Sequence, residues 1–151
     1  MNKELELALS RLPTERSWRL ARWLLDTGAD EFTLGCVWAR SQEPHFCRAA
    51  EEALATFRLP EAGPGLTHRT GRSTRDRTFW RFNEASLGVL EALLPDGIFT
   101  DRQGADSGWL EDLMIYQGGH LRLAVSTHEH EAILRLSDEQ RQEVLKLELL
   151  D

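Results

Sequence analysis

The sequence is poor in the features that mark disulfide-rich, secreted or membrane-spanning chains. It contains two cysteines, Cys36 and Cys47, too few for a disulfide framework, so we expect a reducing, cytoplasmic environment. No apolar run approaches the roughly 20 residues that a membrane-spanning helix needs. The opening segment, MNKELELALS, contains acidic residues where a signal peptide has a basic start and an apolar core. These absences predict a cytoplasmic protein without membrane association.

Motifs of common enzyme classes are also missing. The sequence has no H-E-x-x-H metalloprotease motif, no G-x-S-x-G nucleophile elbow and no calcium loop of the D-x-[DN]-x-[DN]-G type. Cys47 follows His45 at the start of an expected helix, but it borders an apolar stripe, so we expect a buried, inert thiol. Because no set of nucleophile, base and orienting residue can be assembled, the sequence predicts a protein that is not an enzyme and needs no cofactor.

Length and composition predict a single globular domain over residues 1–151. This length is close to the commonest domain size, and 41% hydrophobic and 28% charged residues exclude a disordered chain. The net charge of −7 is concentrated in residues 101–151, where 11 acidic and 5 basic residues give −6. Such an acidic segment repels nucleic acid and anionic membranes and attracts basic partners.

The expected fold class is α+β, with a helical N-terminal half and a mainly antiparallel sheet flanked by helices. We divide the chain into a helical part (1–58), a long polar loop (59–76) and a part that contains the sheet (77–151). Residues 32–38 alternate as in a strand, although Leu34, Val37 and Trp38 also suit a helix. In the helical part we expect helices at 3–11, at 15–26 (capped by Thr14 and ended by Gly28), and from Pro44 to the residue before Pro60.

The part that contains the sheet ends in an expected three-strand meander. Apolar residues alternate with polar ones along each strand, and the two glycines after Gln117 provide the positive φ angles of a tight hairpin. The expected elements are a strand at 77–82, a helix from its cap Asn83 to Leu94, a turn at 95–97, strands at 110–116, 120–126 and 131–136, and a helix at 138–149 opened by a Ser137–Gln140 capping box.

The segment Thr127-His128-Glu129-His130-Glu131 is the sharpest candidate for a metal site, and it makes a metal-binding protein or a metal-dependent hydrolase the second hypothesis for function. On an extended strand, His128 and His130 would leave the same face, as two metal ligands must. His120, across the hairpin, is the candidate third ligand for Zn²⁺ or a similar divalent ion. The alternative is a polar connection that contains two histidines by chance, and the absence of a fixed fourth ligand favours it.

The loop at 59–76 and the strand after it offer a candidate nucleic-acid surface. Basic side chains next to Phe79 and Trp80 could follow a phosphate backbone and stack on bases. The acidic pI of about 5.3 makes nucleic-acid binding the third hypothesis. The basic residues concerned are Arg69, Arg72, Arg75, Arg77 and Arg81.

Residues 77–149 resemble small bacterial toxin-immunity proteins of the α+β type. The resemblance lies in Phe79-Trp80-Arg81-Phe82, a capped helix, PDGIF (95–99) and EDLMIYQGGHLRLAVSTHEHEAILRLSDEQ (111–140). It implies a non-catalytic protein that occludes a cognate toxin. Contact residues in that class vary too much for any single site residue to be inherited.

Charge independently indicates the same class of function, because an acidic protein can mimic the phosphates that a basic nuclease toxin binds. A tight interface also needs a central aromatic anchor, for which Trp109 and Tyr116 are candidates, with core packing as the alternative for both. The oligomeric state stays open. The candidate partner-binding residues are Asp106, Trp109, Glu111, Asp112, Tyr116, Glu129 and Glu131.

Overall fold

Strands and helices are interleaved from the N-terminus onward. The computed structural model describes residues 4–38, 45–60, 78–103 and 108–150. The elements, in chain order, are β1 (Leu5–Ser10), α1 (Thr14–Asp26), β2 (Glu31–Trp38), α2 (His45–Leu54), a 3₁₀ turn (Ala55–Phe57), β3 (Phe79–Arg81), α3 (Glu84–Leu93), β4 (Arg102–Gln103), β5 (Gly108–Gln117), β6 (His120–Ser126), β7 (Glu131–Leu136) and α4 (Asp138–Lys146).

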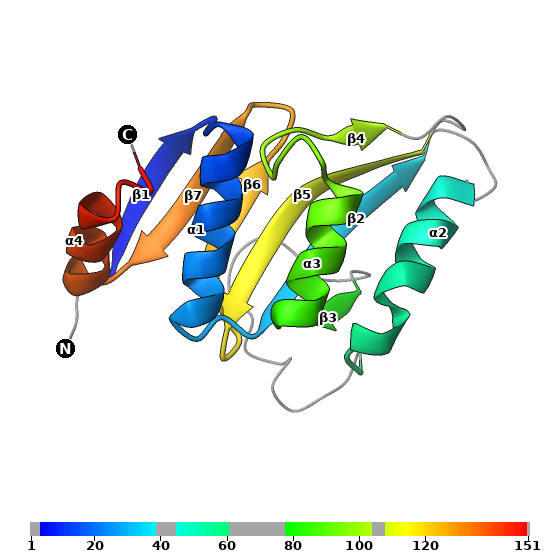
Figure 1. Cartoon of the computed structure of the whole chain (residues 1–151), viewed down its shortest axis with the longest axis horizontal. Coiled ribbons are helices and arrows are strands. Elements are labelled where there is room, and N and C mark those ends of the chain that lie inside the picture. Colours follow the sequence, from blue (N-terminus) through cyan, green and yellow to red (C-terminus); the bar gives the residue numbers. More distant parts are fainter. Residues whose placement is uncertain (1–3, 39–44, 61–77, 104–107, 151) are drawn as a thin grey trace.

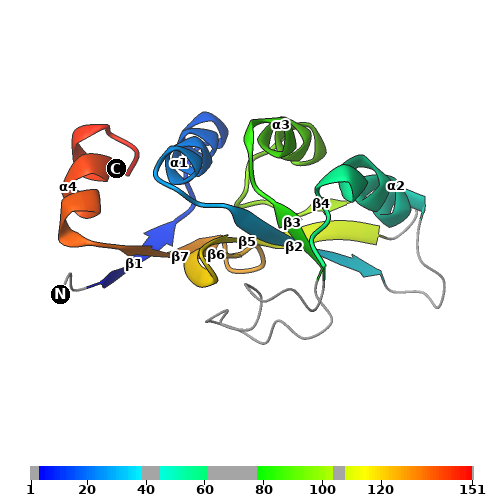
Figure 2. The same ribbon diagram turned by 90° about the horizontal axis from the view of Figure 1, so that it is seen from below.

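These elements form two layers, an antiparallel sheet and a set of helices on one of its faces. The strands follow the order β1-β7-β6-β5-β2-β3, and β4 pairs with the beginning of β5. Figure 1 shows α1, α2 and α3 in front of the sheet and α4 beside its β1 edge. In the view of Figure 2, all four helices lie above the sheet. The expected α+β class is therefore confirmed, whereas the helical N-terminal half is wrong.

The first element is a strand, not the helix expected over residues 3–11. Leu5, Leu7 and Leu9 alternate with polar or small residues along β1 and lie opposite Leu136, Leu134 and Ala132 of β7. Glutamate, leucine and alanine favour a helix locally, but pairing with β7 places the alternating leucines against the core. The tertiary contact overrides the local preference.

Several local predictions are confirmed. Residues 32–38 belong to β2, and β5, β6 and β7 form the expected meander. Gly118 and Gly119 have φ angles of +55° and +84° at the β5–β6 hairpin, and Gly28 has +111° after α1. Side-chain capping boxes open α3 at Asn83 and α4 at Ser137.

Ends of α1, α2 and α4 differ from the sequence prediction. The helix expected from Pro44 to the residue before Pro60 ends at Leu54 and is followed by the 3₁₀ turn Ala55–Phe57. Pro13, and not Thr14, is the N-cap of α1, and the Thr14 hydroxyl donates instead to the carbonyl of Asp96 (3.1 Å). α4 ends at Lys146 rather than Leu149, because Glu148 adopts a φ of +55° and the N–H of Leu149 turns back to the carbonyl of Val144 (3.1 Å). None of these changes alters the layer to which the helix belongs.

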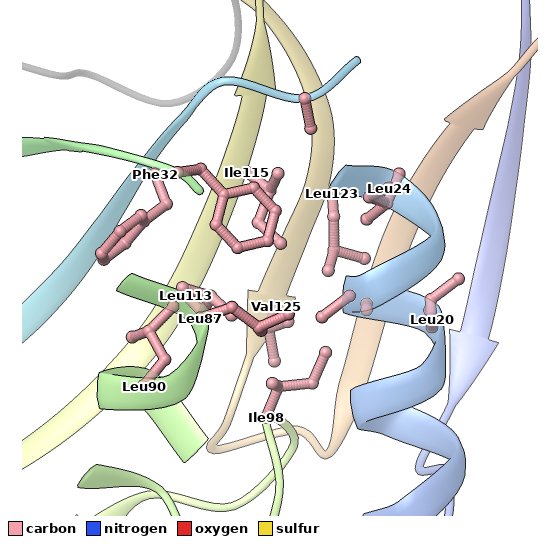
Figure 3. Packing of buried hydrophobic residues seen from close by; sticks show 14 of the residues in the cluster. Leu20, Leu24, Phe32, Leu87, Leu90, Ile98, Leu113, Ile115, Leu123 and Val125 are labelled. Atoms are coloured by element: carbon pink, nitrogen blue, oxygen red, sulfur yellow. The ribbon is translucent and has the colours of Figure 1, made fainter. Parts of the chain in front are cut away.

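The main core lies between the sheet and helices α1 and α3. Figure 3 shows Leu20 and Leu24 of α1 and Leu87 and Leu90 of α3 directed toward apolar side chains of the central strands. Each such side chain contributes about 1.5–3 kcal/mol when it leaves water. The buried residues that meet them are Phe32, Ile98, Leu113, Ile115, Leu123 and Val125.

A disulfide joins Cys36 of β2 to Cys47 of α2, with the two Cα atoms 6.0 Å apart. The expectation of an inert free thiol at Cys47 and of no disulfide is therefore wrong. Cys36 packs against the main core, on the face of β2 that the helices cover, and this brings it beside the buried Cys47. Within the described ranges, no helix combines the length and apolar character needed to cross a bilayer.

Part of the sequence prediction falls outside the described residues. This applies to most of the loop at 59–76, to Arg69, Arg72, Arg75 and Arg77, and to Asp106.

The disulfide should contribute measurably to stability. Replacing both cysteines (Cys36→Ser with Cys47→Ser) should lower the free energy of unfolding in urea by about 2–3 kcal/mol, because the bridge closes a loop across a sequence separation of 11 residues. The free energies of unfolding of the oxidised and the reduced wild-type chain should differ by the same amount. Two reactive thiols in the denatured, unreduced chain would contradict the bridge.

Candidate functional site

The candidate site lies on the face of the sheet opposite the helices. Along β7, Ala132, Leu134 and Leu136 belong to the main core, so Glu131, Ile133 and Arg135 lie on the opposite face. In Figure 2 this face is the lower one, and none of the four helices covers it. Ile133 is 41% exposed and is one of three large apolar side chains among the described residues with such exposure.

A hollow of about 430 Å³ lies here, across β1, β6 and β7. We call it the acidic groove. Its apolar floor includes Ala8, Leu121, Ala124 and Ile133, and three carboxylates border it. The complete lining is Glu6, Ala8, Leu121, Ala124, Val125, Ser126, Glu129, Glu131, Ala132, Ile133 and Arg135.

Charge in the acidic groove is unbalanced. Glu6 and Arg135 are direct cross-strand neighbours and form an ion pair (3.4 Å). In the described part of the chain, neither Glu129 nor Glu131 has a basic partner, and both residues are exposed. The groove therefore has two unneutralised carboxylates at its border. Of the predicted binding residues, the structure brings Glu129 and Glu131 together here.

The turn that positions Glu129 is anchored to the sheet through a β-bulge in β5. Leu34 of β2 faces both Asp112 and Leu113, and Asp112 adopts a φ of +52°. Its carboxylate Oδ1 accepts hydrogen bonds from the N–H (3.0 Å) and the hydroxyl (3.2 Å) of Thr127. Asp112 is therefore a positioning residue for the β6–β7 turn and does not itself line the groove.

Glu111 forms a second link between β5 and the same turn. Its Oε2 accepts from Trp109 Nε1 (3.0 Å) and lies 2.8 Å from His128 Nε2. The Glu111 side chain is 14% exposed, whereas His128 is 67% exposed, so the pair presents the imidazole to solvent. A carboxylate that orients a histidine supplies two of the three members of a hydrolytic triad. Among the described residues, Glu111 is the one partner of this ring, and no nucleophilic hydroxyl or thiol is bonded to it.

The histidines do not form the predicted metal site. Residues 127–130 form a turn rather than an extended strand, and His130 has a φ of +54°. The His128 ring is directed to Glu111 and the His130 Nδ1 to the carbonyl of Phe99 (3.4 Å). His120 lies at the other end of β6, beside the β5–β6 hairpin. Among the described residues, no cluster of three metal-binding side chains occurs.

The two aromatic candidates differ in burial. Tyr116 is fully buried and packs edge-on against Phe79, with ring centroids 5.6 Å apart, in a small cluster with Met114 and Leu121. The structure thus favours the core alternative for Tyr116. Trp109 is partly exposed and lies on the same face of β5 as Glu111, so it stays available as an anchor.

Burial also removes the stacking part of the nucleic-acid hypothesis. Phe79 and Trp80 are 4% and 5% exposed, and Trp80 stacks on Phe32 with centroids 5.5 Å apart. Neither ring can receive a base in this structure.

Sequence reasoning missed four residues of the groove. Glu6 and Ala8 come from β1, which was expected to be helical, and Ile133 and Arg135 were assigned no role. The period-two pattern of leucines at 5, 7 and 9 was the signal that could have placed β1 in the sheet.

Comparison of the chain with models of known families, with curated proteins and with solved structures gave no significant match.

The hydrogen bonds between Asp112 and Thr127 should contribute measurably to the free energy of unfolding. Asp112→Gly keeps the positive φ but leaves the partly buried N–H of Thr127 without an acceptor, which should cost about 1–3 kcal/mol in the free energy of unfolding. Asp112→Asn keeps an acceptor oxygen and tolerates the positive φ, so it should change stability by less than about 0.5 kcal/mol. Urea unfolding of both variants checks this. Equal losses would show that the hydrogen bonds do not hold the turn.

Proposed function

We propose that this chain is an acidic protein-binding module that holds a basic partner against the acidic groove. The single observation that carries the proposal is the sheet face that no helix of the described residues covers, where unpaired Glu129 and Glu131 border an apolar floor containing exposed Ile133. A segment with an apolar side chain flanked by arginine or lysine complements this surface in both shape and charge.

The two kinds of surface make different contributions to binding. Exposed carboxylates accelerate the encounter with a basic protein by long-range attraction, which salt weakens. The apolar floor slows dissociation once water has been displaced. Trp109, on the same face, adds a partly exposed aromatic group.

The most concrete form of the proposal is an immunity protein that occludes a bacterial toxin. Two arguments support it: the resemblance of residues 77–149 to small immunity proteins, and the electrostatic match between an acidic surface and a nuclease that binds phosphate. On this proposal the chain has no catalytic step of its own, and its action is stoichiometric.

The disulfide supports a proposal for the compartment. A bridge between Cys36 and Cys47 persists in an oxidising environment and is rare in the cytoplasm. We therefore infer that the chain meets its partner in an extracellular or periplasmic space, in place of the cytoplasmic location first expected from the low cysteine content.

Charge reversal tests the proposal. Glu129→Lys with Glu131→Lys should slow association with the partner by about tenfold or more at low salt. Two ammonium groups then replace the two unpaired carboxylates and repel a basic partner. The matched control is Glu52→Lys with Glu91→Lys, which makes the same change of charge at exposed positions of α2 and α3 in the helical layer. Its association rate should fall much less.

All three forms of the chain serve as bait for proteins of the source cells, and association rates are then measured with the captured protein. We expect a basic protein at a one-to-one ratio on the wild-type and control chains and little on the groove variant. The wild-type chain should also suppress the toxicity of that protein. Equal capture by the groove variant, or an acidic partner, would refute the proposal.

A further inference from the structure

A buried arginine without a counterion lies outside the acidic groove. Arg122 of β6 is 6% exposed and is the extra residue of a β-bulge, because its neighbours Leu121 and Leu123 lie opposite the adjacent residues Tyr116 and Ile115. The ladder between β6 and β7 begins at Leu123, so the two strands separate at Arg122. Its side chain occupies this separation, since Nε donates to the carbonyl of Arg135 (3.1 Å).

The guanidinium is only partly satisfied. Besides the bond from Nε, Nη1 donates to the Gln117 side-chain oxygen, and both acceptors are neutral. Nη2 is buried and has no hydrogen-bond partner in the described structure, and no ion pair joins Arg122 to a carboxylate there. Burial lowers the pKa of Arg122, and attraction from Glu4 acts in the opposite direction. Fully buried arginines are almost always paired, so this site lacks an expected anion.

Arg122 lines a cavity with room for such an anion. The cavity has a volume of about 320 Å³, at the small end of the range for ligand pockets, and none of its residues belongs to the acidic groove. Its lining residues are Glu4, Gln117, His120, Arg122, Ser137 and Gln140. Side-chain donors from His120 and Gln140 therefore face the same space as the guanidinium.

We propose that this cavity binds a small oxyanion, a phosphate or carboxylate group, through Arg122. The free N–H groups of Nη2 match the acceptor oxygens of such a group, and a charge-assisted hydrogen bond compensates for the burial of both partners. Arg122 lines the cavity, and on this proposal its side chain rotates to present Nη2 to the ligand. The bound anion replaces the missing counterion.

Glu4 provides a specific signature for this site. It is exposed, it lines the cavity, and its carboxylate repels an entering anion while attracting Arg122 from a distance. Removing its charge should therefore tighten anion binding, the opposite of the effect of removing the charge of Arg122. If Arg122 had only a structural role, the two substitutions would not change anion affinity in opposite directions.

The test is a titration of the full chain with inorganic phosphate and with acetate at constant ionic strength set by chloride, followed by calorimetry and by the NMR signals of the Arg122 side chain. Arg122→Gln should weaken binding by about 10- to 100-fold, and Glu4→Gln should strengthen it by about threefold or more. The control Arg48→Gln removes an exposed positive charge from α2 and should leave binding unchanged.

Saturable binding of either probe with this pattern supports the proposal, and the preferred probe distinguishes a phosphate from a carboxylate ligand. The proposal is overturned if neither probe binds the wild-type chain, or if Arg48→Gln weakens binding as much as Arg122→Gln. If Arg122→Gln does not fold, an unchanged affinity in Glu4→Gln overturns it. These outcomes are independent of the acidic groove, whose residues remain intact in every variant.

Discussion

The structure depends on the burial of one face of its central strands. Leu113 and Ile115 of β5 and Leu123 and Val125 of β6 point to the same side, and helices α1 and α3 cover them (Figure 3). Because side chains alternate along a strand, burial of these residues under the helices also determines which residues lie on the other face of the sheet. The helices are therefore confined to one layer, and the second face of the sheet becomes a surface with its own chemistry.

That second face is divided in two. Near β3, Phe79, Met114 and Tyr116 form a buried cluster with Leu121, which also contributes to the floor of the groove. Toward β1 and β7, the acidic groove replaces such a cluster. The two surfaces have opposite consequences, because a buried cluster adds stability, whereas an apolar floor bordered by unpaired carboxylates gains free energy only when a partner covers it.

Both unusual polar positions coincide with irregularities of the strand ladders. Asp112 lies in the bulge of β5 and redirects its carboxylate to the β6–β7 turn, and Arg122 lies in the bulge of β6 and places a cation between separating strands. Bulges commonly re-aim a side chain in this way and are frequent near functional sites. Here they place the two candidate sites at different positions on the sheet.

The sequence was informative wherever a pattern was local and failed wherever a distant strand decided the outcome. The hairpin at Gly118 and the caps at Asn83 and Ser137 need nothing beyond a few neighbouring residues, and they are confirmed. By contrast, the first leucines of the chain become a strand because β7 pairs with them. The same dependence on pairing hid the contribution of Glu6 to the acidic groove.

Two further features could not be predicted for similar reasons. The disulfide requires β2 to direct Cys36 toward a helix that follows it, a relation that a separation of 11 residues does not reveal. Arg122 appears as an ordinary outward residue in an alternating strand until the register shift beside Tyr116 is known. The acidic segment did bring Glu129 and Glu131 into the predicted set, because an excess of acidic residues is visible in composition, but composition does not distinguish them from Glu111 and Asp112, which the fold engages with His128 and Thr127.

The most direct measurement is methyl cross-saturation NMR on the complex with the captured basic partner. Three large apolar side chains have similar exposure: Ile133 on the groove face (41%), and Leu145 and Leu147 at α4 (46% and 44%). Our account predicts that saturation of the partner attenuates the Ile133 methyl signals and leaves those of Leu145 and Leu147 intact. Attenuation at Leu145 and Leu147, with Ile133 unaffected, would contradict it.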